Sequence, residues 1–130
     1  MHASEPLGHQ YPGKGKTFPQ ELEYFLSYHL ETNVILAHWG GGLPLFGHMP
    51  EIRRILKNTY FDTAATPYLY DSGIYQTMIN IVGIENILFG SDYPLMSYQK
   101  VFAHLEDAKL TPTEMETILV QNGRRILNSW

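Results

Sequence analysis

Three short, uniformly apolar runs, separated by segments with helical periodicity, constrain the fold of this 130-residue chain most strongly. The runs are NVILAH (33–38), NTYFDTAA (58–65) and NILFGSD (86–92). Strands of a parallel sheet that are buried on both faces have uniformly apolar sequences, whereas half-buried strands alternate. Strands that alternate with single helices predict a parallel α/β sheet. We therefore expect a single α/β domain that spans residues 1–130.

The segments between these runs carry apolar residues at helical spacing. The apolar stripes lie within residues 22–30, 52–56, 74–82 and 101–108. Pro19 suits the first position of the first helix, and Thr111 with Glu114 predicts the N-cap and capping box of a last helix. The runs recur at a nearly constant interval, and one further interval back leads to MHASE (1–5). We therefore expect about four parallel βα units, the first of them truncated, and a terminal helix.

Composition excludes several classes of partner. The net charge is only −4 and no run of Lys or Arg occurs, so we expect no nucleic-acid partner. The chain has no cysteine, which excludes disulfides and is compatible with a reducing compartment. No apolar run approaches the roughly 18 residues of a membrane span, and the N-terminus lacks the apolar core of a signal peptide. We expect a cytoplasmic chain that acts on a small molecule.

Polar residues stand where each predicted strand ends. They are His2, His38, Asp62 and Asp92. The carboxyl ends of parallel strands meet at one edge of a sheet, where the active sites of parallel α/β proteins form. The sequence therefore predicts a site at this edge.

Each of these residues also has a structural interpretation. A single histidine such as His38 is often a core residue, but Gly40–Gly42 removes side chains where a ligand or backbone comes close, which favours function. Asp92, in GSDYP, is either a turn residue or a ligand or general base, and its place at the edge favours the second. Asp62 is either functional or bonded to loop backbone. His2 is interpreted as functional.

The loop GHQYPGK (8–14) matches the beginning of a phosphate-binding motif. That motif continues with Ser or Thr, which binds magnesium, but Gly15 stands there, so we expect no nucleotide site. Lys14 and Lys16, with His9 nearby, have two equally supported interpretations: they hold an anionic group of a substrate, or they belong to a solvated glycine loop. Trp39, beside His38, is a further expected substrate contact.

Four motifs in order carry a resemblance to a known family: HASEPLGHQYPGKG, AHWGGG, FDTAA and LFGSDYP. They resemble the later half of the amidohydrolase-related family, TIM-barrel metal-dependent hydrolases that include decarboxylases related to aminocarboxymuconate-semialdehyde decarboxylase. The resemblance extends from His2 to QNGRRIL (121–127). It implies the C-terminal half of a (β/α)8 TIM barrel.

The resemblance also implies roles for individual residues. His2 corresponds to a metal ligand, and Asp92 to a residue that binds the metal or takes a proton from its water. His38 corresponds to a catalytic histidine near the substrate and this water. Imidazole and carboxylate suit zinc or a similar divalent ion, which lowers the pKa of bound water to about 7. A neighbouring His or Asp then moves the proton.

The sequence departs from the family in one important way. The family has an H-x-H pair on its first strand, and no H-x-H occurs here. A full barrel takes about 250 residues, and a catalytic zinc usually has three protein ligands. We therefore expect a metal site that is incomplete in this chain, and a half-barrel that self-associates or pairs with a missing N-terminal half.

Three functions remain open at this point. The first is a fragment of a metal-dependent hydrolase that acts on a small ester, lactone or amide. The second is a metal-dependent decarboxylase of the same fold, in which Lys14 or an arginine holds a carboxylate. The third is a non-catalytic half-barrel that self-associates or binds a partner.

Overall fold

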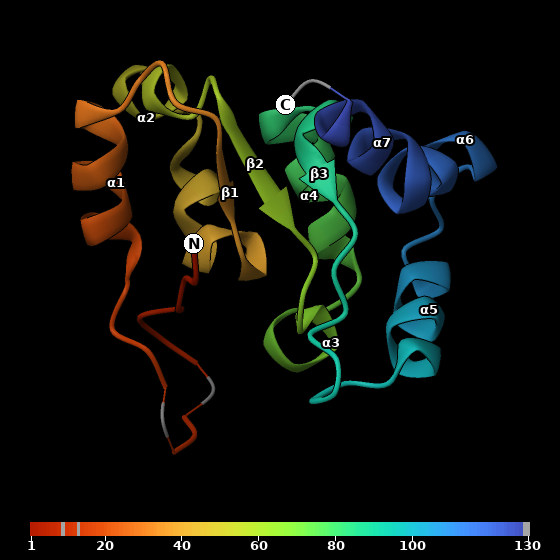
Figure 1. Cartoon of the computed structure of the whole chain (residues 1–130). Coiled ribbons are helices and arrows are strands. Elements are labelled where there is room, and N and C mark those ends of the chain that lie inside the picture. The colour runs from red at the N-terminus through yellow and green to blue at the C-terminus, as the bar shows by residue number, and fades with distance from the viewer. Residues whose placement is uncertain (9, 13, 129–130) are drawn as a thin grey trace.

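The computed structural model describes residues 1–8, 10–12 and 14–128, and its centre is a small parallel sheet (Figure 1). The strands are β1 (Val34–Leu36), β2 (Thr59–Asp62) and β3 (Ile87–Leu88), in the order β1-β2-β3. Leu36 pairs with Phe61, and Phe61 pairs with Ile87. Both pairings are parallel, which confirms the predicted α/β class. The carboxyl ends of the strands point downward in Figure 1.

Helices occupy every interval that the periodicity predicted. They are α1 (Pro19–Tyr28), α2 (Pro50–Ile55), α3 (Thr66–Leu69), α4 (Gly73–Val82), α5 (Tyr98–Asp107), α6 (Pro112–Glu116) and α7 (Asn122–Leu127). The tight turns η1 (His38–Phe46) and η2 (Ile84–Asn86) precede α2 and β3, and the π-turn η3 (Thr117–Gln121) joins α6 to α7. No helix among the described residues has the length and hydropathy of a membrane span.

The predicted helix starts are confirmed in detail. Pro19 is the first residue of α1. Thr111 caps α6, because its hydroxyl accepts the Glu114 N–H while the Glu114 carboxylate accepts the Thr111 N–H. These hydrogen bonds favour the ionised carboxylate and hold the pKa of Glu114 below its ordinary value.

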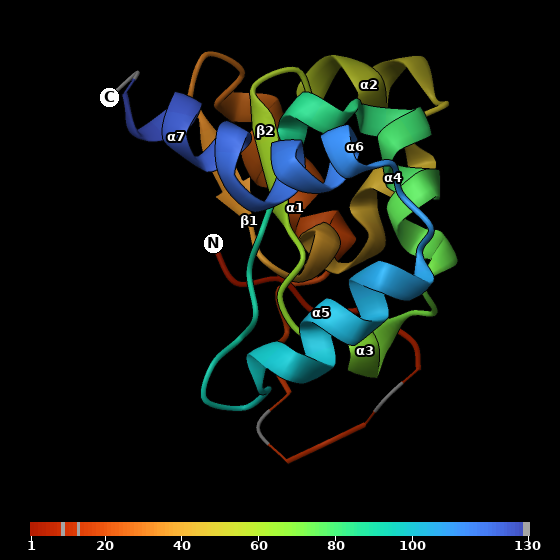
Figure 2. The same cartoon turned by 90° about the vertical axis from the view of Figure 1, so that its right-hand side faces the viewer.

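The hydrophobic core lies on one face of the sheet. Leu36, Phe61 and Ile87 are fully buried and pack with residues of α1, η1 and α4. Ile35 and Tyr60, which alternate with them, are only half-buried. The prediction that the strands are buried on both faces is therefore wrong for β1 and β2, whereas both residues of β3 are buried. Figure 2 shows α6 and α7 in front of the strands, with α5 below them beside α3.

The first of the four predicted βα units has no strand. Met1 nevertheless pairs with β1 as a parallel strand would, because its amino group donates to the Ile35 carbonyl and its carbonyl accepts the Ala37 N–H at 2.9 Å. The segment then leaves the sheet edge, and the Ser4 N–H bonds to the Thr17 carbonyl at 2.9 Å. Within the N-terminal segment, Met1 is thus the residue that pairs with β1 in the manner of a parallel strand.

A left-handed turn follows β1 directly. Residues 38–42 all have positive φ, between 53° and 87°. This conformation costs about 1–2 kcal/mol for a residue with a Cβ and almost nothing for glycine. A Cβ on Gly41 would lie 2.5 Å from the backbone oxygen of Ser4, and one on Gly40 would lie 3.1 Å from the Phe61 ring. The three glycines therefore serve the backbone turn and its close packing.

Replacing Gly41 with alanine tests this interpretation. Gly41→Ala is expected to lower the free energy of unfolding by about 2 kcal/mol or more, because the new methyl group meets backbone and the φ of +60° is unfavourable. Gly123→Ala in α7 is the matched control, since its Cβ would meet open space, and should raise stability by up to about 1 kcal/mol. Equal midpoints of urea unfolding for the two variants would contradict the assignment.

Candidate functional site

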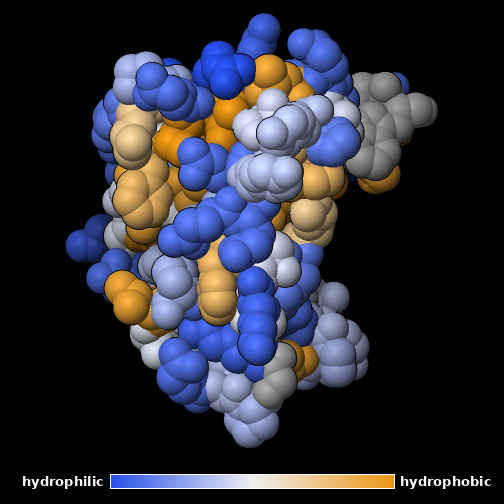
Figure 3. All heavy atoms as spheres, turned by 90° about the vertical axis from the view of Figure 1, so that its left-hand side faces the viewer, coloured by the Kyte–Doolittle hydropathy of each residue, from blue (hydrophilic) through white to orange (hydrophobic). Residues whose placement is uncertain are grey.

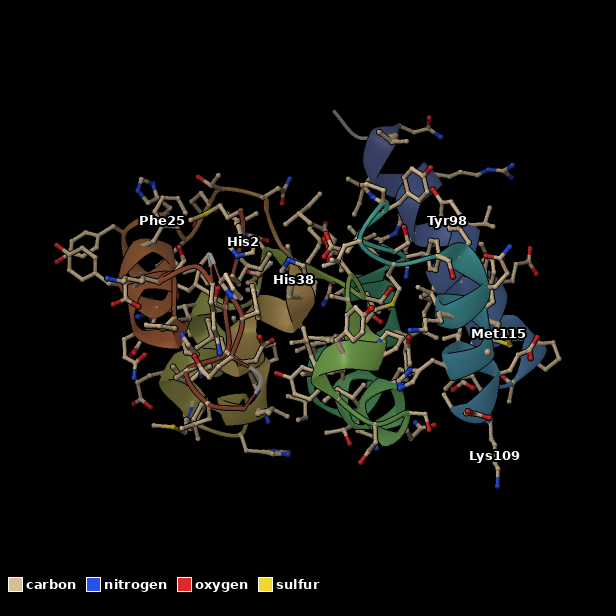
Figure 4. The ribbon with its side chains drawn as sticks, turned by 90° about the horizontal axis from the view of Figure 1, so that it is seen from below. His2, Phe25, His38, Tyr98, Lys109 and Met115 are labelled. Carbon is tan, nitrogen blue, oxygen red and sulfur yellow. The ribbon has the colours of Figure 1, made fainter. Side chains whose placement is uncertain are left out.

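Two hollows at the carboxyl ends of the strands share three of the predicted site residues. The first, here called the rim pocket, has a volume of about 650 Å³, and the second, the sheet-edge pocket, about 610 Å³. His2, His38 and Asp92 line both, and Asp62 lines the second. Figure 4 looks onto this end of the molecule. All four strand-end residues therefore meet at one edge, as the sequence predicted.

His38 is fixed by two neighbours on the β2 loop. Its Nδ1 lies 3.1 Å from the Ala64 carbonyl, and its backbone N–H donates to Asp62 at 2.9 Å. A carbonyl only accepts, so Nδ1 carries the proton and Nε2 keeps its lone pair. Only 9% of the residue is exposed. This arrangement orients the ring and leaves one basic nitrogen for the pocket.

His2 lies directly beside His38. The two rings meet edge to face with their centroids 5.0 Å apart (Figure 4). The His2 Nε2 is 3.3 Å from the hydroxyl of Ser4, which is 1% exposed. A Cβ on Gly15 would lie 3.0 Å from the His2 ring, so the glycine leaves the room that this ring fills. His2 itself is exposed, and its position is set by these contacts.

Asp92 occupies the loop after β3 with a φ of +68°, a region that aspartate tolerates better than most residues. It is half-buried, and its carboxylate has no hydrogen-bond donor within the part of the chain that the structure describes. The side chain lines both pockets, so this carboxylate is available to a ligand.

Asp62 has a structural role, which was one of its two predicted interpretations. One carboxylate oxygen accepts the N–H groups of His38 and Ala64, at 2.9 and 3.0 Å. The side chain therefore holds the backbone of two strand ends together.

Thr63 connects the loops after β2 and β3. Its hydroxyl donates to the Gly90 carbonyl and accepts the Gly90 N–H, both at 3.0 Å. The residue is completely buried. The loop that orients His38 is thereby joined to the loop that leads to Asp92. Sequence reasoning missed Thr63, because nothing in the sequence distinguishes this threonine from others.

The predicted substrate contacts do not gather at this site. Trp39 is completely buried, donates to the Thr66 hydroxyl at 2.8 Å and packs edge-on against Tyr75, so the structure corrects its assignment to the substrate. The left-handed turn sends the side chains of His38 and Trp39 in different directions. Lys14 lies 3.5 Å from the Leu7 carbonyl and lines neither pocket. His9 lies outside the described residues.

The rim pocket has a wall that the sequence analysis did not predict. Its members include Glu5, Tyr11, Tyr68, Leu69 and Leu95. The Tyr70 hydroxyl donates to Glu5 at 3.4 Å, across 65 positions of sequence. Burial, and then the charge of Glu5 and this hydrogen bond, raise the pKa of Tyr70 above its ordinary value. Tyr70 therefore stays protonated and orients a carboxylate at the wall.

The side chains of His2, His38 and Asp92 are of types that bind metals, but they do not form a complete metal site. Imidazole and carboxylate are suitable ligands for zinc and related ions. The described residues contain no group of three His, Cys, Asp or Glu side chains placed to hold an ion. A catalytic zinc usually has three protein ligands, so these residues do not form the centre by themselves.

Comparison with known sequences identifies the family. The profile of the amidohydrolase family matches residues 17–128, so this chain belongs to the amidohydrolase family. His38 and Asp92 lie inside the matched range, and His2 precedes it. No curated protein matches the sequence.

Solved structures show the same fold. A 2,6-dihydroxybenzoate decarboxylase from Rhizobium has a TM-score of 0.73 at 19% identity, over 98% of this chain and 50% of that chain. A Polaromonas dihydroxybenzoic acid decarboxylase with bound manganese and 2-nitroresorcinol has a TM-score of 0.68 at 19% identity, over 86% of this chain and 41% of that chain. A zinc-bound amidohydrolase from Burkholderia multivorans has a TM-score of 0.62 at 16% identity, over 82% of this chain and 48% of that chain. The chain is a partial TIM barrel that spans half of these proteins or less.

The role of Asp62 can be tested with a pair of substitutions. Asp62→Ala removes the acceptor of two N–H groups and should lower the free energy of unfolding by about 1–3 kcal/mol. Asp62→Asn keeps an oxygen in the same place and should lose less than about 1 kcal/mol. Chemical denaturation compares the two, and an equal loss would show that the charge matters rather than the acceptor.

The tautomer of His38 can be measured directly. Two-bond ¹H–¹⁵N correlation spectra at about pH 8, where imidazole is neutral, should show the proton on Nδ1. His38→Gln identifies the signals by removing them. A proton on Nε2 would mean that Nδ1 does not donate to Ala64.

Proposed function

We propose that this chain supplies half of the active site of a metal-dependent amidohydrolase-type enzyme. In this proposal His38 moves protons, while His2 and Asp92 ligate a divalent metal, with zinc as the first choice. The observation that carries the proposal is the His38 ring, which is fixed through Nδ1 and lines the same pocket as His2 and Asp92.

His38 is suited to proton transfer by the contact of its Nδ1 with the Ala64 carbonyl. With its Nδ1 bound to Ala64, the ring accepts a proton only at Nε2. The charge that forms can be stabilised by Asp92, the unpaired carboxylate on the same pocket. A proton acceptor held in one orientation contributes typically 10²–10⁴-fold to a reaction rate.

The missing ligands would come from residues other than those described. Catalytic residues of TIM-barrel enzymes come from several strands around the barrel. This chain spans 41–50% of the three structures compared above. We therefore expect the complete centre to require a further half-barrel, and the isolated chain to have little or no activity.

Hydrolysis of a small neutral ester, lactone or amide is the favoured reaction. Neither pocket is lined by Lys or Arg within the described residues, so this half offers no cation to a substrate carboxylate. Tyr11, Tyr68 and Leu95 give the rim pocket an aromatic and apolar wall, which suits a small uncharged substrate.

Decarboxylation is the second candidate. It is supported by the similarity to two solved decarboxylases, at TM-scores of 0.73 and 0.68. In this case the carboxylate would need a cation or metal from elsewhere, because Lys14 lies off both pockets. The product distinguishes the two reactions: carbon dioxide from decarboxylation, and an acid with an alcohol or amine from hydrolysis.

Metal analysis of the isolated chain tests the proposal. The chain should bind Zn²⁺ or Mn²⁺ weakly, lose the ion on desalting and turn over neither an ester nor a carboxylated aromatic substrate, because two ligands hold a metal poorly. His2→Gln and Asp92→Asn should weaken binding further in calorimetric titrations. Lys109→Gln, far from the pockets in Figure 4, is the control and should bind as the unchanged chain does.

Two results would contradict this assignment. Equal metal binding by the unchanged chain and Asp92→Asn would remove Asp92 from the ligands. One tightly bound metal per chain, together with turnover, would show that these residues form a complete centre.

A further inference from the structure

A further concave region lies at the opposite end of the molecule from the two pockets. A hollow of about 470 Å³ is lined by His48, Pro50, Arg53, Arg54 and Lys57, and is here called the basic hollow. Lys57 stands two residues before β2 begins, so the hollow lies at the amino ends of the strands. Figure 3 shows this side of the molecule, where hydrophilic residues are spread over the whole face and stand beside hydrophobic ones at the top.

The basic hollow concentrates positive charge in an acidic chain. Three of the nine Lys and Arg residues fall within positions 53–57, although the net charge of the chain is −4. No acidic residue is among those that line the hollow. These cations form no continuous basic run in the sequence, because Ile55 and Leu56 separate Lys57 from the two arginines.

The fold presents these cations in fixed places. Ile52 and Ile55 of α2 are buried, as is Leu56 directly after it, whereas Arg53 and Arg54 are exposed and face outward. The Arg53 Nε donates to the Gly47 carbonyl at 3.2 Å. Its two terminal nitrogens keep their donors for a ligand, since Nε alone makes this bond.

The Gly47 carbonyl that anchors Arg53 is itself held firmly. The Gly47 N–H bonds to the Pro44 carbonyl at 2.8 Å. A Cβ on Gly47 would lie 2.5 Å from Ile81 of α4, so this loop packs directly on the neighbouring helix. The loop that positions Arg53 is therefore packed against α4.

We propose that the basic hollow binds a small anion with two or more charges, of the phosphate class. An arginine fork, a second arginine and a lysine match the oxygens of such a group. The concave shape and the volume of about 470 Å³ suit a small molecule. This site shares no residue with the rim and sheet-edge pockets, so it is independent of the proposed active site.

Calorimetric titration of the chain with inorganic pyrophosphate tests the proposal, with sodium chloride holding the ionic strength constant. We expect one saturable site. Arg54→Gln with Lys57→Gln should weaken it at least tenfold, while Arg53 and its anchor stay intact. Lys109→Gln with Arg124→Gln is the control, because it removes the same charge from exposed positions outside the hollow. Circular dichroism establishes that each variant is folded.

Each other outcome overturns the proposal. Absence of saturation, or equal weakening by both double variants, would mean non-specific charge attraction. Tighter binding of a single-stranded oligonucleotide than of pyrophosphate, with the same dependence on Arg54 and Lys57, would assign the hollow to a nucleic acid. If Arg54→Gln with Lys57→Gln unfolds the chain, Lys57→Gln alone is compared with Lys109→Gln, and equal affinities would again reject the site.

Discussion

The left-handed turn at residues 38–42 is the constraint on which the rest of the structure depends. It places Trp39 in the core and His38 at the pocket, although the two are neighbours in sequence. It also brings the backbone of Gly41 against that of Ser4, which holds the N-terminal segment at the edge of the sheet. His2 lies beside His38 as a result. One backbone conformation thus determines both the burial of Trp39 and the contact between the His2 and His38 rings.

The chain combines a well-built core with an incomplete set of site residues. The core is formed between the sheet and α1, η1 and α4, all within the described residues. In the proposed function, the donors at the rim are part of a site whose other ligands come from further strands, as catalytic residues of TIM barrels do. Packing is satisfied by neighbouring βα units, whereas a metal centre needs ligands from distant strands. A stable core therefore needs a shorter length of chain than a complete metal centre does.

Sequence reasoning succeeded where the cause is local. The apolar periodicity predicted the helices, and Pro19, Thr111 and Glu114 marked two helix starts correctly. The meeting of the strand-end residues followed from the geometry of parallel sheets. These features depend on residues close in sequence or on a general rule of topology.

The sequence did not predict features that depend on the direction of a side chain or on a contact between residues far apart in sequence. The burial of Trp39 depends on a turn whose handedness the glycines only hint at. The Glu5–Tyr70 pair joins residues 65 positions apart, and the basic hollow gathers cations that no run reveals. The half-exposed Ile35 and Tyr60 depend on which face of the sheet the helices cover.

The Thr63 contacts have a further consequence for how this site varies. Asp62 and Ala64 position His38, and Thr63 between them is bonded twice to Gly90, two residues before Asp92. The loops that carry His38 and Asp92 are thus joined by one set of hydrogen bonds. Substitutions at His38, Thr63 and Asp92 are therefore epistatic, because groups within one network have non-additive effects. Evolution of a new specificity at this site proceeds through coordinated changes in two loops.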